Sequence, residues 1–193
     1  TLGTVSPVVA KSMGLAVDCK VYVGLHDSNA SYLRYLCNSQ SGVDSFTVVS
    51  TGTWTILMQA RGDLSSLHQR RDTLANCDVY GDPIACARFM GGREYDAICQ
   101  RLGGDIKTPV TQQDIQGALD NLWMVTPDFS SGNGPYGGLE PKLQCPLPAP
   151  SAGAIATLYC ALMIDQRLSD LQASGAIYIE GAFLKNPLLC QVV

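Results

Sequence analysis

An aspartate directly follows an apolar stretch of the chain, where a carboxylate has no packing role. The stretch Lys20–Leu25 (KVYVGL) is rich in β-branched and aromatic residues and predicts a strand. At its exit, Asp27 could accept a proton from a substrate hydroxyl and help to hold Mg²⁺ beside a phosphoryl group. A helix cap is an equally good interpretation, because Asp27, Ser28 and Asn29 are all of the types that begin helices.

Three turns that contain glycine each follow a predicted strand, at Gly52-Thr53, Gly91-Gly92 and Gly181-Ala182. Glycine lets the backbone approach a ligand closely, and the amides that follow can donate hydrogen bonds to phosphate oxygens. Ligands of open α/β sheets gather beyond the strand ends. Several such turns in one chain favour a nucleotide held largely by the backbone, although ordinary hairpins and helix caps use glycine in the same way.

The elements that must position these residues alternate in type. Strands are predicted over 46–50, 54–59, 77–80, 84–89 and 176–179. Helices are predicted over 29–37, 93–102, 111–122 and from Ser151 to Gly175, with another that begins near Asn186. The segments 61–76 and 126–150 are expected to be loops. Hairpins followed by alternating helices and strands indicate an α/β fold, a mixed sheet with helices on both faces.

Composition narrows the class of protein. The 193 residues are 46% hydrophobic and 16% charged, with a net charge of −4 and no basic cluster. We therefore expect a globular protein whose main partner is neither nucleic acid nor a membrane. Eight cysteines form no C-x-x-C pair, which favours free, buried thiols in a reducing cytoplasm over disulfides or a zinc site.

Four segments together resemble one family. Gly24–Ser31 (GLHDSNAS) resembles the G-x-H-D-[ST]-x-A-S segment of the FGGY carbohydrate kinases, which include xylulose, fuculose, rhamnulose, ribulose and glycerol kinases. Ser50–Trp54 (STGTW) is similar to the S-x-G-T phosphate turn of that family, and Arg88–Tyr95 (RFMGGREY) to its R-F-x-G-G-R-E-Y segment. Ile179–Pro187 (IEGAFLKNP) resembles the adenine turn E-G-G-x-x-x-N-P, with Ala182 in place of the commoner second glycine. The order and approximate spacing are those of the family.

The resemblance implies an actin-like ATPase fold, of the ribonuclease H-like type, in two lobes. Residues 1–193 would be a single domain that makes most of the C-terminal lobe. The activity implied is ATP-dependent phosphorylation of a sugar, with Mg²⁺. Asp27 would be the catalytic base and a metal ligand, and His26 and Asp27 would contact the sugar.

The resemblance also assigns the nucleotide site. Gly52 and Thr53 would contact the β- and γ-phosphates, and Gly91 and Tyr95 would line the nucleotide pocket. Gly181, Ala182 and Asn186 would frame the adenine.

The D-x-G-T phosphate loop of the family's first lobe does not occur in the sequence. We therefore expect the N-terminal lobe to be a required partner and the chain by itself to be inactive. The segment RFMGGREY favours a ketose kinase over a glycerol kinase but does not identify the sugar. The sequence also leaves the oligomeric state open, and a homodimer is one possibility. Two alternatives are a non-catalytic nucleotide-binding domain of the actin and sugar-kinase superfamily and an inactive, truncated kinase. The string His26-Asp27-Ser28 favours the kinase, and this function requires Asp27 to face a cleft close to the three glycine turns.

Overall fold

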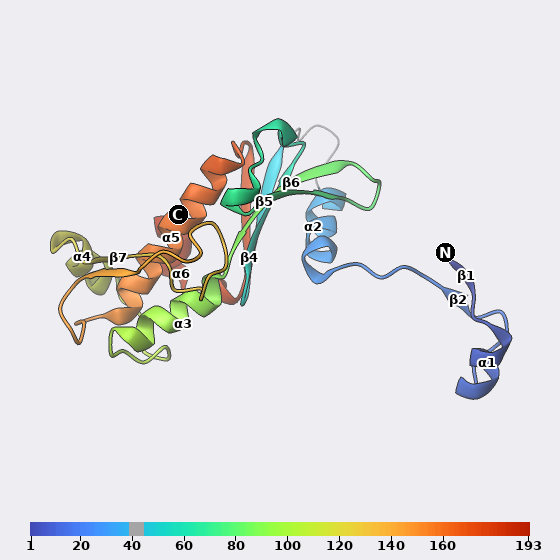
Figure 1. Ribbon diagram of the computed structural model, residues 1–193, viewed down its shortest axis with the longest axis horizontal. Coiled ribbons are helices and arrows are strands. Elements are labelled where there is room, and N and C mark those ends of the chain that lie inside the picture. The colour runs from blue at the N-terminus through green and yellow to red at the C-terminus, as the bar shows by residue number, and fades with distance from the viewer. Residues whose placement is uncertain (39–44) are drawn as a thin grey trace.

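The computed structural model describes residues 1–38 and 45–193, and its body is a five-stranded sheet between helices (Figure 1). The strands are β3 (Phe46–Thr51), β4 (Thr55–Ala60), β5 (Thr73–Cys77), β6 (Pro83–Phe89) and β9 (Ala176–Gly181). Their order in the sheet is β5-β6-β4-β3-β9. The β3–β9 pair is parallel and the other pairs are antiparallel.

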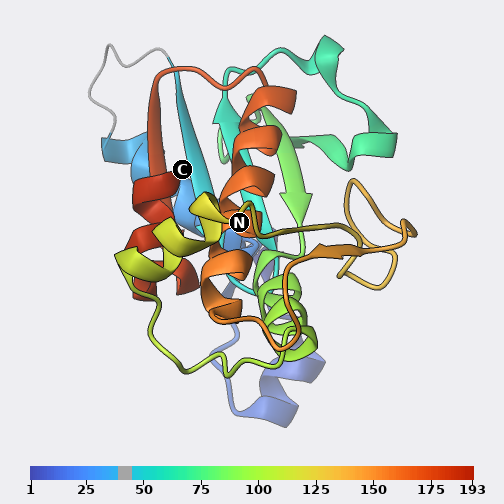
Figure 2. The same cartoon turned by 90° about the vertical axis from the view of Figure 1, so that its left-hand side faces the viewer.

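Helices cover both faces of this sheet, as Figures 1 and 2 show from two directions. Along β6, Ala85, Ala87 and Phe89 point into one core, and Ile84 and Cys86 point into the other. On the first face lie α3 (Gly91–Arg101), α4 (Gln112–Asp120), α5 (Ala152–Asp170) and α6 (Pro187–Val192), and on the second lies α2 (Asp27–Asn38). The prediction of a mixed α/β sheet with helices on both faces is confirmed.

Two predicted helix starts are confirmed by their caps. The Thr111 hydroxyl accepts the Asp114 amide while the Asp114 carboxylate accepts the Thr111 amide, a reciprocal pair that begins α4. The Ser151 hydroxyl accepts the amide of Ala154 at 3.3 Å and begins α5. Capping chemistry is local, so it can be read from a few neighbouring residues.

The strand predicted over Lys20–Leu25 is wrong for most of its length. Only β2 (Lys20–Val21) pairs, with β1 (Gly3–Thr4), and Tyr22 and Val23 beyond it are 65% and 71% exposed. With α1 (Pro7–Met13), these two short strands lie apart from the five-stranded sheet (Figure 1). An apolar, β-branched composition needs a neighbouring strand to become a strand, and here β1 offers only two residues.

The two predicted loops also contain regular structure. Between 61 and 76 lie the 3₁₀ turns η1 (Leu64–Ser66) and η2 (Gln69–Arg71) and most of β5. The turn of the β5–β6 hairpin begins earlier than predicted, because the Asp78 carboxylate accepts hydrogen bonds from the backbone amides of Tyr80 and Asp82 at 2.8 and 3.0 Å. Within 126–150, β8 (Lys142–Gln144) returns to pair with β7 (Met124–Thr126).

The eight cysteines divide by position. Those on β6, α3 and α5 are buried, namely Cys86, Cys99 and Cys160. The prediction of buried thiols is wrong for Cys37, Cys77 and Cys190, which are exposed near the ends of their elements. Among the helices in the described ranges, each is too short or too polar to cross a bilayer.

A buried carboxyl group joins α3 to α5. Glu94 is 2% exposed, and the Tyr159 hydroxyl donates a hydrogen bond to it. Burial raises the pKa of Glu94 above its ordinary value of 4.5, and the hydrogen bond from Tyr159 opposes this only in part. A raised pKa means that the folded state favours the neutral acid, so the contribution of Glu94 to stability is lost as the pH rises through its folded pKa.

Replacing this acid with its neutral isostere should therefore change the pH dependence of stability. We expect Glu94→Gln to unfold at the same denaturant concentration as the wild type below pH 4.5 and at a higher concentration as the pH rises, because glutamine does not ionise. Denaturant unfolding at several pH values measures the difference. A constant difference across the pH range would show that Glu94 does not carry a raised pKa.

A second test concerns the turn that leads from α5 into β9. Gly175 has a φ of +80°, and a Cβ there would lie closer than 3.0 Å to the Ser45 carbonyl oxygen. Gly175→Ala should lower the free energy of unfolding by roughly 2 kcal/mol. The matched control is Gly117→Ala in α4, where no atom within 4 Å would meet the new Cβ; it should stabilise the chain by about 0.8 kcal/mol. Equal effects at the two positions would contradict this description of the turn.

Candidate functional site

The three glycine turns predicted from the sequence meet at one end of the sheet. Thr51, the last residue of β3, is opposite Thr55 of β4 on one side and Gly181 of β9 on the other. Thr55 in turn is opposite Phe89, which precedes Met90 and the Gly91-Gly92 turn. The Gly92 amide donates to the Gly52 carbonyl at 3.1 Å. Turns separated by up to 129 positions in the chain thus form one continuous backbone surface.

Steric contact explains why most of these positions are glycine. At Gly181, where φ is +91°, a Cβ would lie closer than 3.0 Å to the Thr51 carbonyl oxygen. A Cβ on Gly92 would meet the Gly52 carbonyl equally closely. Gly52 is different, because its nearest neighbour would be the Trp54 carbonyl at 3.6 Å, an ordinary contact. Packing within the chain therefore does not require glycine at position 52, and its open side is available to a ligand.

A cavity of about 760 Å³ lies beside the third turn. Three of the residues predicted for the nucleotide line it, namely Tyr95, Ala182 and Asn186. Phe183 completes the wall, with its ring centroid 6.0 Å from that of Tyr95. The side-chain amide of Asn186 donates through Nδ2 to the Thr157 hydroxyl at 2.8 Å, which holds the turn against α5. The size and the aromatic lining are those of a small-molecule site.

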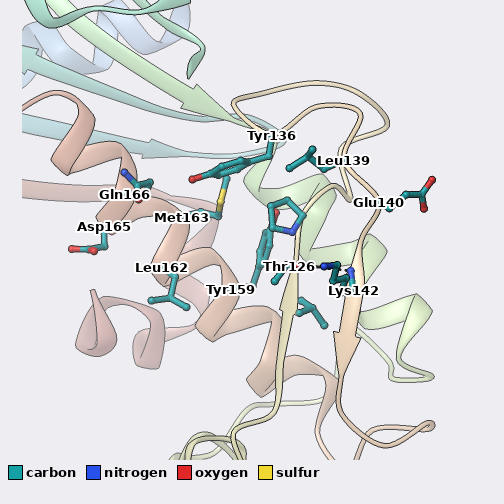
Figure 3. Close-up of a pocket in the computed structure, with 12 residues that line it drawn as sticks. Thr126, Tyr136, Leu139, Glu140, Lys142, Tyr159, Leu162, Met163, Asp165 and Gln166 are labelled. Carbon is teal, nitrogen blue, oxygen red and sulfur yellow. Dashed lines mark hydrogen bonds between the residues drawn. The ribbon is translucent and has the colours of Figure 1, made fainter. Parts of the chain in front are cut away.

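The middle of α5, together with β7 and β8, lines a separate cavity of about 660 Å³ (Figure 3). Tyr136, Tyr159 and Met163 point into it between the helix and the two strands. None of the residues predicted for the site lines it. It is therefore distinct from the surface made by the glycine turns.

Asp27 lies at the exposed beginning of α2. Its side chain is 90% exposed, and His26 Nδ1 is 2.8 Å from its Oδ1. The Ser28 amide donates to the same oxygen at 2.7 Å. Asp27 is thus open to solvent in the described part of this chain, and the cleft expected around it would need a further surface to complete it. His26 and Asp27 do lie together, as predicted.

A polar clamp fixes α2 against β9. The Glu180 carboxylate accepts hydrogen bonds from the Ser31 hydroxyl, from Arg34 Nη2 at 2.9 Å and from the Tyr35 hydroxyl at 3.1 Å. The Tyr35 ring stacks on that of Tyr178, with centroids 4.7 Å apart. On the helix, Ser31 contacts Glu180, and Tyr35, one turn later, stacks on Tyr178, which lies two residues earlier on β9. The helix and the strand therefore run in opposite directions.

This register places the start of the helix. Four residues of helix rise about 6 Å, nearly the length of two residues of strand. Asp27 lies one helical turn before Ser31, at the first residue of α2. The start of the helix also contacts β5, because the side-chain amide of Asn29 donates to the Cys77 carbonyl at 3.0 Å.

The residues present suit one kind of magnesium site. In the described ranges no group of three His, Cys, Asp or Glu residues lies close enough to hold a metal ion. Mg²⁺ in nucleotide-dependent enzymes is commonly held by one or two carboxylates together with phosphate oxygens and water. Asp27 fits such a site as a single carboxylate ligand.

Three residues of this end of the sheet were not predicted. The Thr51 hydroxyl donates to the Glu180 carbonyl and accepts the Phe183 amide at 3.0 Å, which holds the third turn on β3. Glu180 clamps α2, and Phe183 lines the cavity. Thr51 and Phe183 look like ordinary strand and core residues in the sequence. Glu180 gave a signal, since it is an acid at the end of an apolar stretch of the sequence.

Comparisons with known proteins identify the family and the fold of the chain. A sequence model described as the C-terminal domain of FGGY carbohydrate kinases matches residues 43–193, a range that begins after Asp27. A carbohydrate kinase from Novosphingobium aromaticivorans is 32% identical, with a TM-score of 0.70 over 98% of this chain and 43% of its own. Xylulose kinase from Rhodospirillum rubrum shares the fold at 14% identity, with a TM-score of 0.62 over 99% of this chain and 40% of its own. No curated protein sequence matches.

The chain thus spans less than half the length of these two solved kinases. The sheet, with helices on both faces, is that of the actin-like ATPase fold to which these sugar kinases belong. From the family match over most of its length, the chain belongs to the FGGY carbohydrate kinase family and carries the C-terminal domain of that family over residues 43–193.

Proposed function

We propose that this chain supplies the nucleotide side of an ATP-dependent sugar kinase. The observation that carries the proposal is the convergence of three glycine turns and the cavity lined by Tyr95 and Ala182 at one end of the sheet. The two form adjoining parts of one surface, because Gly181 ends β9 and Ala182 begins the turn that lines the cavity. A nucleotide has the same two parts, a flat base and a chain of phosphates.

The base would enter the cavity between the two aromatic rings and the Ala182 turn. The rings of Tyr95 and Phe183, which pack against each other, make this wall apolar, and burial raises the pKa of Tyr95 to about 12, so its phenol stays neutral. The phosphates would then extend across Gly91 towards Gly52 and Thr53. Thr53 is exposed, and the open side of Gly52 lets phosphate oxygens reach the backbone amides of the turn.

The acceptor would approach from the side of α2. Asp27 is proposed to take the proton from a sugar hydroxyl, with His26 beside it as a sugar contact. Mg²⁺, when bound, would neutralise charge on the phosphates, with Asp27 as its protein ligand from this chain. The exposure of Asp27 means that another surface must close over it before water is excluded from the reaction.

That surface is proposed to be the N-terminal lobe of a two-lobed kinase, for which residues 1–193 would form most of the C-terminal lobe as one domain. Support comes from the lengths of the similar kinases, of which this chain covers 43% and 40%. The substrate is proposed to be a ketose or a related polyol, in a cytoplasmic setting. A non-catalytic nucleotide-binding domain remains the competing function, and the role of Asp27 separates the two.

The decisive variant is Asp27→Asn in a two-lobed protein that carries these 193 residues. We expect kcat to fall by roughly 10²–10⁴-fold, because asparagine cannot accept the hydroxyl proton. The KM for the sugar should change little, since the amide keeps most of the contacts of the acid. A coupled assay of ADP release, with a panel of ketoses and polyols, measures both constants.

Asp120→Asn on α4 is the matched control, because it makes the same chemical change away from the turns and should leave kcat unchanged. The 193-residue chain without its partner lobe should phosphorylate no sugar. Activity of Asp27→Asn within about tenfold of wild type would exclude Asp27 as the base. Turnover by the isolated chain would contradict the two-lobed arrangement.

A further inference from the structure

A third cavity lies on the face of the sheet that α2 covers only in part. It measures about 470 Å³ and is bounded by His26 at the start of the helix and by Arg88 on β6. Arg88 belongs to this face because Ile84 and Cys86, at even positions on the same strand, pack into the core beneath α2. Among the described residues that line the cavity, Arg88 is the only arginine or lysine.

Two neighbours hold the Arg88 guanidinium in place. Its Nε is 3.0 and 3.1 Å from the two carboxylate oxygens of Asp72, which precedes the strand next to β6. Its central carbon lies 5.0 Å from the centre of the Trp54 ring. Across residues 1–38 and 45–193, the two Nη groups make no hydrogen bond or ion pair. The side chain is therefore fixed through Nε, and its two Nη groups remain available as donors in a residue that lines the cavity.

The position of these donors relates them to the other parts of the site. Trp54 directly follows Thr53 in the first glycine turn, so the guanidinium lies beside the turn proposed for the γ-phosphate. His26 also lines the cavity, and its Nδ1 is 2.8 Å from Asp27 Oδ1. Arg88 therefore contacts the residue that follows the phosphate turn and shares a cavity with the neighbour of the proposed base. In a kinase, the phosphoryl group passes from the phosphate turn to the acceptor beside the base.

We infer that Arg88 is a further catalytic residue, whose Nη groups donate to the phosphoryl group during its transfer. The inference rests on the proposed kinase function. In the step, the sugar hydroxyl oxygen forms a bond to the γ-phosphorus while the bond from that phosphorus to the β–γ bridging oxygen breaks. The hydroxyl proton passes to Asp27, and the products are ADP and a sugar phosphate. The Arg88 guanidinium stabilises the negative charge on the phosphoryl oxygens while the phosphorus is shared between the sugar oxygen and the β–γ bridging oxygen.

The competing interpretation is a cross-strand ion pair that serves only the fold. Two observations favour the catalytic role. The Arg88 side chain is 44% exposed, and ion pairs with such exposure contribute little to stability. Asp72 contacts only Nε, whereas a purely structural pair would gain most from a bidentate contact that includes an Nη group.

The test uses a two-lobed protein that carries this chain, with Arg88→Gln, Arg88→Lys and the matched variant Asp72→Asn. Asparagine tolerates the left-handed backbone of Asp72, whose φ is +53°, so this variant removes the ion pair and leaves the guanidinium. We expect Arg88→Gln to lower kcat by about 100-fold or more, with the sugar KM within threefold. Arg88→Lys should recover part of the loss, and Asp72→Asn should stay within tenfold of wild type.

Binding of ADP with aluminium fluoride in the presence of the sugar provides a readout that a structural role would not move. This complex imitates the phosphoryl group in transit, so Arg88→Gln should weaken its binding by at least tenfold while the affinity for ADP alone is unchanged. If Asp72→Asn loses as much activity as Arg88→Gln, or if Arg88→Gln keeps kcat within fivefold, the inference is wrong. A wild-type protein that phosphorylates no sugar would instead defeat the proposed function itself.

Discussion

The close approach of backbone to backbone at the end of the sheet is the constraint on which the site depends. Gly181 and Gly92 come so near to the carbonyl groups of Thr51 and Gly52 that neither position has space for a side chain. The Thr51 hydroxyl then ties the end of β9 to β3. Because these contacts hold three distant turns together, the backbone amides of the turns and the wall of the cavity lined by Tyr95 and Ala182 form one surface. A ligand met by fixed backbone groups loses little of its binding energy to ordering the protein.

The two faces of the sheet carry different parts of the proposed site. The helices α3 and α5 support the cavity in which Tyr95 and Phe183 stand, while α2 carries Asp27 on the other face. The Glu180 clamp couples the two, since Glu180 precedes Gly181 in the chain and holds α2 through Ser31 and Arg34. The position of the proposed base therefore depends on the strand that ends in the proposed nucleotide turn. Arg88, on β6, lines a cavity together with His26, the neighbour of that base.

What the sequence could predict was local. Caps such as Thr111 and Ser151, the turn at Gly52 and the strand over 84–89 follow from a few neighbouring residues, and each was confirmed. The close approach of the three turns was only a hypothesis, because register between distant strands is not visible in sequence. The strand predicted from Lys20 failed for a related reason, since its composition shows a tendency to pair but not the presence of a partner. Phe183 and Arg88 could not be assigned roles without knowing which face of the sheet they occupy.

The most direct measurement is a crystal structure of the two-lobed protein with a non-hydrolysable ATP analogue. We expect the purine ring in the cavity that Tyr95, Phe183 and Ala182 line, with the terminal phosphate on the amides of Gly52 and Thr53. A purine bound instead in the cavity of Tyr136 and Tyr159, away from the glycine turns, would contradict the nucleotide site described above.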